Sequence, residues 1–299
     1  MGMNANVEKI ISKIGDLPAI PEIVNEVLSL TQDPHVSVSD VSNLIEKDPA
    51  LAAKLLKVSN SSYYGMRQVV GTLKLALVIL GIKEVRNIVL GISVLDTLKD
   101  PELDTLLDKE GLWDHSTQVA SLAKKFGTFL EINLQGEDFV SGLLHDIGKM
   151  VLWKSMKSDY SDIYYAAKSQ GVSLSDLEYE NFGFDHADVG GVLANTWNLP
   201  ASLCDALWYH HPRSDRPLNE AKDPKLAALV RVSNYASNED WNFDWEVDEK
   251  PDPNGYRSCA DEEVWYVLQD GRDFYDLDKR FDILSGFMQE IQVVPALAI

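Results

Sequence analysis

The residues best suited to chemistry stand in the stretch GLLHDIGK, residues 142–149, which contains His145, Asp146 and Lys149. His145 and Asp146 follow apolar residues that suit a buried helix, so both groups need a partner to offset the cost of burial. If the segment is one helix, His145 and Lys149 share a face and Asp146 is turned from His145 by about 100°. The pattern leaves three partners open: a metal ion, a substrate, or each other. A lysine beside a metal suits phosphate binding.

The histidines of the chain are concentrated in one region. His35 stands in the turn QDPHVS, and the other five are His115, His145, His186, His210 and His211. Neutral imidazole is the commonest metal ligand, and a carboxylate oxygen can complete such a site. A single histidine is more often an ordinary core or surface residue. Five histidines and Asp146 from different helices, however, could converge in a bundle core as helical metal sites do.

The histidines must be positioned by helices, because apolar residues recur at helical spacing throughout this region. Gly127 is expected to end the helix that carries His115, and Asp185 and Asp223 to cap two later helices. Pro212 is expected to stop the helix that carries the last two histidines. The predicted helices are 111–127, 137–153, 171–183, 185–198, 200–212 and 223–237.

The preceding part of the chain also predicts helices: one over residues 17–31, two within 37–65, and two over 72–80 and 83–97. Ser39 can cap one of them, and Asp48 another, with Pro49 at the first helical position. Gly81 separates the last two helices. Strand patterns are weak throughout, so the sequence predicts an all-α fold. This first block has no cluster of metal-ligating side chains and is interpreted as a packing or interaction module.

Composition divides the 299 residues into three predicted units: residues 1–99, 100–240 and 241–299. The first is the apolar helical block and the second is the bundle with the histidines. The third begins with a loop and is expected to contain two short helices, near 261–269 and 273–289. Residues 237–280 hold 14 acidic and 5 basic residues, so this end of the chain is strongly acidic.

The formal charge of −20, from 47 acidic and 27 basic residues, argues against nucleic acid and anionic lipid as partners. No apolar run is long enough to predict a transmembrane helix, and the first residues lack the pattern of a signal peptide. The two cysteines, Cys204 and Cys259, are expected to be reduced thiols. These features predict a cytoplasmic protein.

The order His115, His145-Asp146, His186, His210-His211 resembles the HD superfamily of metal-dependent phosphohydrolases, and LLHDIGK is the motif most specific to it. The chain resembles the HDOD domain, a regulatory relative, over about residues 17–236. The segments that carry this likeness are LPAIPEIVNEVLSL, LIEKDPALAAKLLKVSNSSYYG, LALVILGIKEVRNIVLG, FDHADVGGVLANTWNLP and WYHHP. The resemblance implies a helical N-terminal subdomain packed on an HD-like bundle, here followed by a short acidic helical extension.

The resemblance also implies a role in bacterial signal transduction. Many HDOD domains have lost the metal-binding residues and are thought to act by interaction. This sequence keeps His115, His145, Asp146, His186, His210 and His211 as implied metal ligands. At the last ligand position Asn234 replaces an aspartate, and Gly111 stands where two-metal phosphodiesterases have a glutamate. The Gly-Tyr-Pro motif of those enzymes is absent after HDIGK.

Two functions follow from these features. The first is a regulatory protein with a metal-binding pocket, which acts on protein partners of a signalling pathway or binds a phosphorylated or nucleotide ligand. The second is a metal-dependent phosphohydrolase, in which Lys149 would contact phosphate. The expected cofactor is one or two ions of iron, manganese, zinc or nickel. Because Asn234 offers no negative charge, whether hydrolysis occurs is left open.

Overall fold

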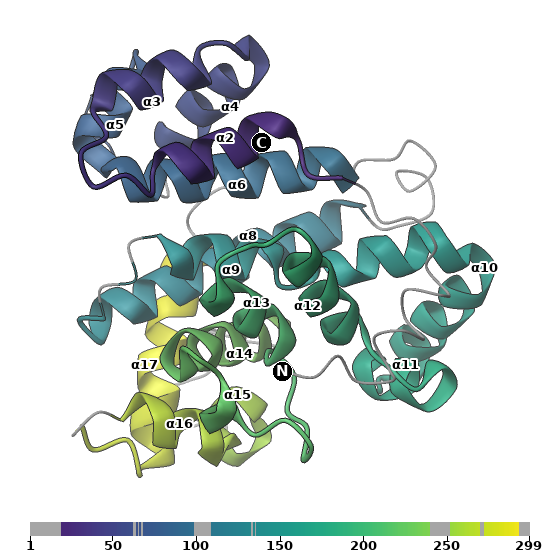
Figure 1. Cartoon of the computed structure of the whole chain (residues 1–299). Coiled ribbons are helices and arrows are strands. Elements are labelled where there is room, and N and C mark those ends of the chain that lie inside the picture. Colours follow the sequence, from purple (N-terminus) through teal and green to yellow (C-terminus); the bar gives the residue numbers. More distant parts are fainter. Residues whose placement is uncertain are drawn as a thin grey trace.

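The computed structural model describes residues 19–98 except 62, 63, 65 and 67, residues 109–239 except 133 and 135, and residues 252–269 and 272–292. Within these ranges the regular structure is helical and no strand occurs, which confirms the all-α prediction. No helix of this part of the chain is both long enough and apolar enough to cross a bilayer. The N-terminal helices lie on one side of a larger bundle, and the last helices lie at the bundle's far end (Figure 1).

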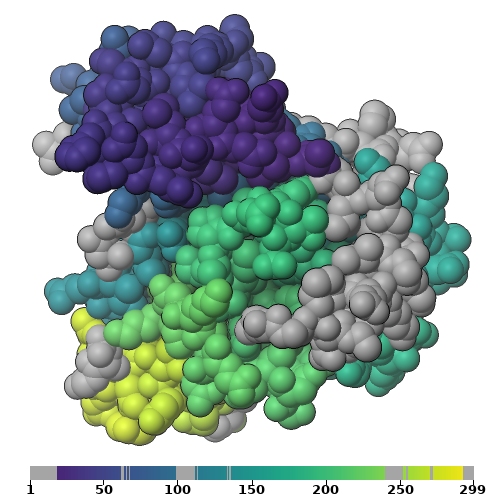
Figure 2. All heavy atoms as spheres, in the orientation of Figure 1, coloured from purple at the N-terminus to yellow at the C-terminus, as the bar shows by residue number. Residues whose placement is uncertain are grey.

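Five helices form the N-terminal part of the described chain, and the last of them, α6, joins the others to the bundle. They are α2 (Glu22–Leu30), α3 (Val38–Ile45), α4 (Pro49–Ser59), α5 (Leu73–Leu80) and α6 (Ile82–Leu98). Helix α6 contacts α2, α4 and α5, and it also contacts α9 and α10 of the bundle. Figure 2 shows the result from outside, as a block of N-terminal residues seated on the bundle.

Local signals set most of the helix ends in this block. Asp48 caps α4 with Pro49 at its first position, and Gly81, at φ 90°, follows the last residue of α5, as predicted. The prediction that Ser39 caps α3 is wrong. The cap is Ser37, whose hydroxyl accepts from the Asp40 amide while the Asp40 carboxylate accepts from the Ser37 amide. This reciprocal pair requires an acidic or amide side chain three residues after the serine, which Ser39 lacks.

The bundle follows with helices that carry or support the histidines. They are α8 (Lys109–Phe129), α9 (Glu137–Leu144), α10 (Ile147–Gln170), α11 (Leu174–Phe182), α12 (His186–Thr196), α13 (Ala201–Trp208) and α14 (Pro224–Asn238). Gly127 does not end α8, contrary to the prediction. A Cβ there would lie 3.3 Å from Asp138 Oδ2 and 3.5 Å from Leu229 Cδ1, so the glycine permits close packing inside the helix.

The prediction of one helix over residues 137–153 is wrong. The segment forms two helices, and the break between them falls at the candidate site. Helix α9 ends at Leu144, and α10 begins at Ile147, with Asp146 as its N-cap residue at φ −96°, ψ 10°. The first turn of α10 crosses the first turn of α12, and the two backbones are in direct contact. A Cβ on Gly148 would lie 1.9 Å from the carbonyl oxygen of His186. The chain therefore turns at His145 and Asp146, and these side chains do not follow the geometry of one continuous helix.

The C-terminal helices cover the end of the bundle formed by α8 and α14. They are the 3₁₀ turn η2 (Pro253–Gly255), α15 (Arg257–Ala260), α16 (Glu262–Leu268) and α17 (Leu277–Gln292). The last two match the helices expected near 261–269 and 273–289, and α15 is additional. One hydrophobic core joins the N-terminal helices to α9, α10, α12 and α13, and a second joins α8 and α14 to the C-terminal helices. The division into residues 1–99, 100–240 and 241–299 stays a prediction.

Gly142→Ala is expected to lower the free energy of unfolding by about 1–3 kcal/mol, because the added methyl group would overpack the α8–α9 contact. Its Cβ would lie 2.6 Å from the Ala120 Cα, which is backbone that cannot move aside locally. Gly286→Ala is the matched control, since a Cβ at this helical position in α17 meets no atom within 4 Å. Urea unfolding should show Gly286→Ala to be neutral or more stable by up to about 1 kcal/mol. Equal effects at the two positions would contradict the packing described.

Candidate metal centre

Five histidines and one aspartate meet inside the bundle. Helix α8 supplies one of them, the α9–α10 junction supplies two, the first residue of α12 supplies one, and the turn after α13 supplies two. They are His115, His145 and Asp146, His186, and His210 and His211, in that order. Helix α13 ends at Trp208, earlier than the predicted stop at Pro212, so the last two histidines lie in a turn and not on the helix.

The first group of potential ligands consists of His115, His145 and Asp146. The Nε2 atoms of the two histidines are 3.1 Å apart. Oδ2 of Asp146 lies 3.5 Å from His115 Nε2 and 3.3 Å from His145 Nε2. The three atoms thus face one small volume from three sides.

The second group consists of Asp146, His186, His210 and His211. Asp146 contributes its other oxygen, Oδ1, which lies 3.2 Å from His186 Nε2 and 3.6 Å from His210 Nε2. His186 Nε2 is 2.9 Å from His211 Nε2 and 3.3 Å from His210 Nε2. Asp146 is therefore shared, with one carboxylate oxygen turned toward each group.

Two of the rings are oriented by backbone carbonyls. His145 Nδ1 lies 2.7 Å from the Gly142 oxygen, and His210 Nδ1 lies 2.6 Å from the Leu207 oxygen. A carbonyl only accepts, so Nδ1 donates the proton in each ring, and Nε2 of the neutral ring presents a lone pair toward the centre. Burial lowers the pKa of His210 to about 3, which keeps that ring neutral.

Glu178 on α11 holds His186, although no sequence pattern predicts this role. Its Oε2 accepts from His186 Nδ1 at 2.6 Å and from the His186 amide at 2.7 Å, and its Oε1 accepts from the Tyr160 hydroxyl at 2.6 Å. Burial alone would lower the pKa of His186, but the carboxylate raises it to about 9. A positive charge is thus favoured at this ring. Acidic residues in a polar helical segment usually face solvent, and only the packing of α11 turns Glu178 inward.

His115 is held from α14 through Ser237. Its Nδ1 lies 3.0 Å from the Ser237 hydroxyl, which donates to the carbonyl of Asn234 at 3.0 Å. Burial lowers the pKa of His115 to about 3, so the ring is neutral. The Asn234 amide oxygen accepts from Asn238 Nδ2 at 3.1 Å. Asn234 thus supports the first group through its backbone, and its side chain is bonded along its own helix.

Asp146 is the most constrained charge of the site. It is 2% exposed, and its Oδ2 accepts from Lys149 Nζ at 2.5 Å. Burial alone would raise the pKa of Asp146, but His145 and Lys149 hold it well below its ordinary value. Its Oδ1 accepts no hydrogen bond from the part of the chain that the structure describes. An ionised, buried oxygen without a donor is costly, and a metal ion or a proton on a facing ring would offset that cost.

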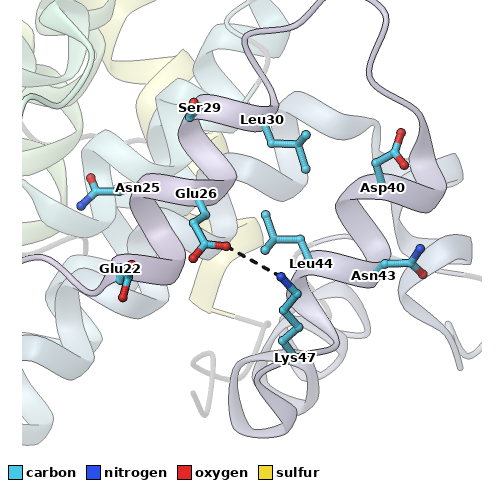
Figure 3. Close-up of a pocket in the computed structure, with 9 residues that line it drawn as sticks. All are labelled: Glu22, Asn25, Glu26, Ser29, Leu30, Asp40, Asn43, Leu44 and Lys47. Atoms are coloured by element: carbon cyan, nitrogen blue, oxygen red, sulfur yellow. Dashed lines mark ion pairs between the residues drawn. The ribbon is translucent and has the colours of Figure 1, made fainter.

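A separate groove lies between α2 and α3, among the N-terminal helices (Figure 3). Its volume is about 880 Å³, and one ion pair crosses it, with Lys47 Nζ 4.0 Å from Glu26 Oε2. Both side chains are largely exposed, so this pair adds little stability. The lining residues include no histidine or cysteine, and the chemistry suggested by the sequence lies elsewhere.

A protein-family model described as the HDOD domain matches residues 17–212 of the chain. A curated relative, an uncharacterized protein of Treponema pallidum (strain Nichols), is 25% identical over 218 residues. The match covers 70% of this chain but only 41% of the relative's own length.

Several solved structures resemble the fold. An HDOD domain protein from Geobacter sulfurreducens is 24% identical, with 96% of this chain and 95% of that chain covered and a TM-score of 0.74. A Shewanella amazonensis SB2B protein named provisionally as a phosphohydrolase is 23% identical, with 96% and 98% covered and a TM-score of 0.67. A Marinobacter aquaeolei VT8 protein named provisionally for signal transduction is 20% identical, with 95% and 66% covered and a TM-score of 0.65. At these identities the likeness establishes the fold alone.

Glu178→Gln is expected to weaken metal binding roughly 10–100-fold, because the group that orients a ligand histidine and raises its basicity loses its charge. Calorimetric titration of the metal-free protein with zinc or manganese would measure this change. Tyr160→Phe is the matched control, since it removes a hydrogen bond to the same carboxylate but leaves its charge and its contact with His186. Affinity unchanged in Glu178→Gln, or weakened equally in Tyr160→Phe, would contradict the role assigned to the carboxylate.

Proposed function

The chain belongs to the HDOD domain family, and on that premise we propose that it is a bacterial signal-transduction protein whose histidine–aspartate pocket binds metal. We propose further that it acts in the cytoplasm, mainly by binding a protein partner or a small phosphorylated or nucleotide ligand. The similar fold of the Marinobacter protein named for signal transduction supports this role.

The observation that carries the proposal is the convergence of imidazole nitrogens on Asp146. Two donors bound to one ion at about 2.0–2.1 Å lie about 3.3–3.4 Å apart at the tetrahedral angle and about 2.8–3.0 Å apart at the right angle of an octahedron. The separations of 3.1 Å between His115 and His145 and of 3.3 Å between His186 and His210 lie within the limits that these two geometries set. Two neutral rings that turn Nε2 lone pairs toward each other at such distances repel, and a bound cation removes that repulsion. The residues present therefore fit a metal ion.

The donor set limits which metal fits. It consists of imidazole nitrogens and carboxylate oxygens without a thiolate, which suits iron, manganese, zinc or nickel. Asp146 turns one oxygen toward each group, so the pocket would take one ion or two. We propose His115, His145, Asp146, His186, His210 and His211 as the ligands, and we give Asn234 a supporting role.

Two features favour regulation over hydrolysis. Asn234 stands where a final aspartate would add negative charge, and its side-chain oxygen is already bonded to Asn238. Lys149, the candidate phosphate contact, is paired with Asp146 at 2.5 Å. A neutral amide weakens the attraction for a dication, and a paired lysine has less charge to offer to a ligand.

A metal-dependent phosphohydrolase is the second candidate function. It is favoured by the position of Lys149 on the exposed side of the pocket. His115, His211 and Lys149 are partly exposed, whereas His145, Asp146, His186 and His210 are buried. An anionic ligand would thus enter beside the Lys149 ammonium group, which would hold a phosphoryl oxygen. Bound metal would supply an activated water and a clamp for phosphoryl oxygens.

Elemental analysis of protein purified without chelators should find one or two transition-metal ions per chain. His145→Ala and Asp146→Ala should each abolish the metal, because one removes an inward lone pair and the other the shared carboxylate. His35→Ala is the control, since His35 is exposed and lies outside the pocket. Metal-free wild-type protein that also fails to bind added zinc or manganese would refute the site.

Assays with cyclic and linear dinucleotides should show little turnover by metal-loaded wild-type protein, since the Asn234 side chain is neutral and Lys149 is paired. Parallel calorimetry would test whether the same nucleotides bind without being cleaved. A metal-dependent rate that disappears in His145→Ala would reverse the ranking of the two functions.

A further inference from the structure

Helix α5 is apolar on all sides, yet only one of its sides is covered. Seven of the eight residues of LKLALVIL are apolar. Leu73, Ala76 and Leu77 are buried against the other N-terminal helices. The remaining side presents Leu75, Val78 and Ile79, which are 42%, 69% and 48% exposed. These three positions are spaced i, i+3 and i+4, so they form one stripe along the helix.

Val69, just before α5, is exposed as well, at 83%. Its neighbour Val70 is buried and is held at both backbone groups by Asn60 at the end of α4. Asn60 Oδ1 accepts from the Val70 amide at 2.7 Å, and Asn60 Nδ2 donates to the Val70 carbonyl at 2.9 Å. The exposure of Val69 therefore belongs to an anchored segment. We call Leu75, Val78 and Ile79 the α5 face, and Val69 precedes it in the chain.

The charges of the chain segment that contains the α5 face oppose those of the whole protein. Residues 49–83 contain five basic residues and no Asp or Glu, in a chain with a net charge of −20. Lys54 is paired with Asp96 at 2.5 Å. Lys74 on α5 and Lys83 on the first turn of α6 are exposed, and neither has an ion-pair partner among the described residues. The apolar stripe is thus accompanied by positive charge.

The α5 face also lies apart from the metal pocket. Helix α5 contacts α3, α4 and α6, and it lies on the outer side of the N-terminal helices (Figure 1). A contiguous exposed apolar patch rimmed by polar groups marks an interaction site in many proteins. The α5 face therefore shares no residue with the metal pocket.

We infer that the α5 face docks an acidic amphipathic helix of a partner protein. Apolar side chains of that helix would cover Leu75, Val78 and Ile79, and its carboxylates would meet Lys74 and Lys83. A second copy of this chain is a poorer occupant, because a symmetric contact between two α5 faces would bring like-charged lysines together. An anionic membrane is poorer too, because the net charge of −20 repels it.

The test uses the full chain and two synthetic helix-forming peptides that differ in one respect. Both carry leucines spaced alternately three and four residues apart, so that the leucines form one face of a helix. The other positions are mostly glutamate in one peptide and lysine in the other. Fluorescence anisotropy should show saturable binding of the glutamate peptide and none of the lysine peptide. Val78→Asp should weaken binding roughly tenfold or more, as expected for an apolar residue central to a contact. The double substitution Lys74→Glu and Lys83→Glu should shift the preference toward the lysine peptide.

Tyr266→Asp is the matched control, because Tyr266 is 71% exposed on α16, close to the 69% exposure of Val78. It should leave peptide binding unchanged, and thermal unfolding should show both variants folded. Absence of saturable binding, or equal binding by wild type and Val78→Asp, would overturn the inference. So would concentration-dependent self-association lost in Val78→Asp, which would assign the face to a second copy. If the wild type sediments with phosphatidylserine vesicles and Val78→Asp does not, the α5 face would be assigned to a membrane.

Discussion

A single buried carboxylate is the constraint on which the arrangement of the bundle depends. Asp146 lies at a turn between two helices, is 2% exposed, and is faced by imidazoles from three other parts of the chain. An ionised carboxylate in such a place is tolerated only when positive charge or hydrogen-bond donors surround it. Lys149 satisfies one oxygen, whereas the other faces the Nε2 atoms of His186 and His210 and accepts no hydrogen bond from the described residues. A proton on the facing ring of His186, whose pKa is raised to about 9, or the metal ion proposed for the pocket would offset the cost of this oxygen.

Much of the surrounding structure serves to hold the imidazoles still. Glu178 fixes His186, and Ser237 fixes His115. The turn with His210 is held by buried Arg231, which donates to the Tyr209 carbonyl at 2.8 Å and to Glu263 of α16 at 2.8 Å. The C-terminal helices thereby reach the backbone beside a proposed ligand. This gives the acidic extension a structural reason to pack on α14.

The family and the pocket together limit the possible functions but do not specify a reaction. The fold is shared with proteins named provisionally for hydrolysis and for signalling, so the fold does not choose between them. The choice between them rests on side chains. The neutral Asn234 and the paired Lys149 favour a pocket that binds a ligand without hydrolysing it. The exposed α5 face, among the N-terminal helices and away from the pocket, is the surface proposed to contact a partner.

The sequence by itself determined the helical class, most helix starts and the list of candidate ligands. Asp48, Asp185 and Asp223 cap helices as predicted, because capping depends only on residues within one turn of each other. Tertiary structure decided the rest. Gly127 packs inside α8, and the chain turns at Asp146 just before Gly148 meets the backbone of α12. Glu178 faces inward because α11 packs on the site. These outcomes depend on contacts between residues far apart in the chain, and a local pattern carries no record of which helix will lie against which.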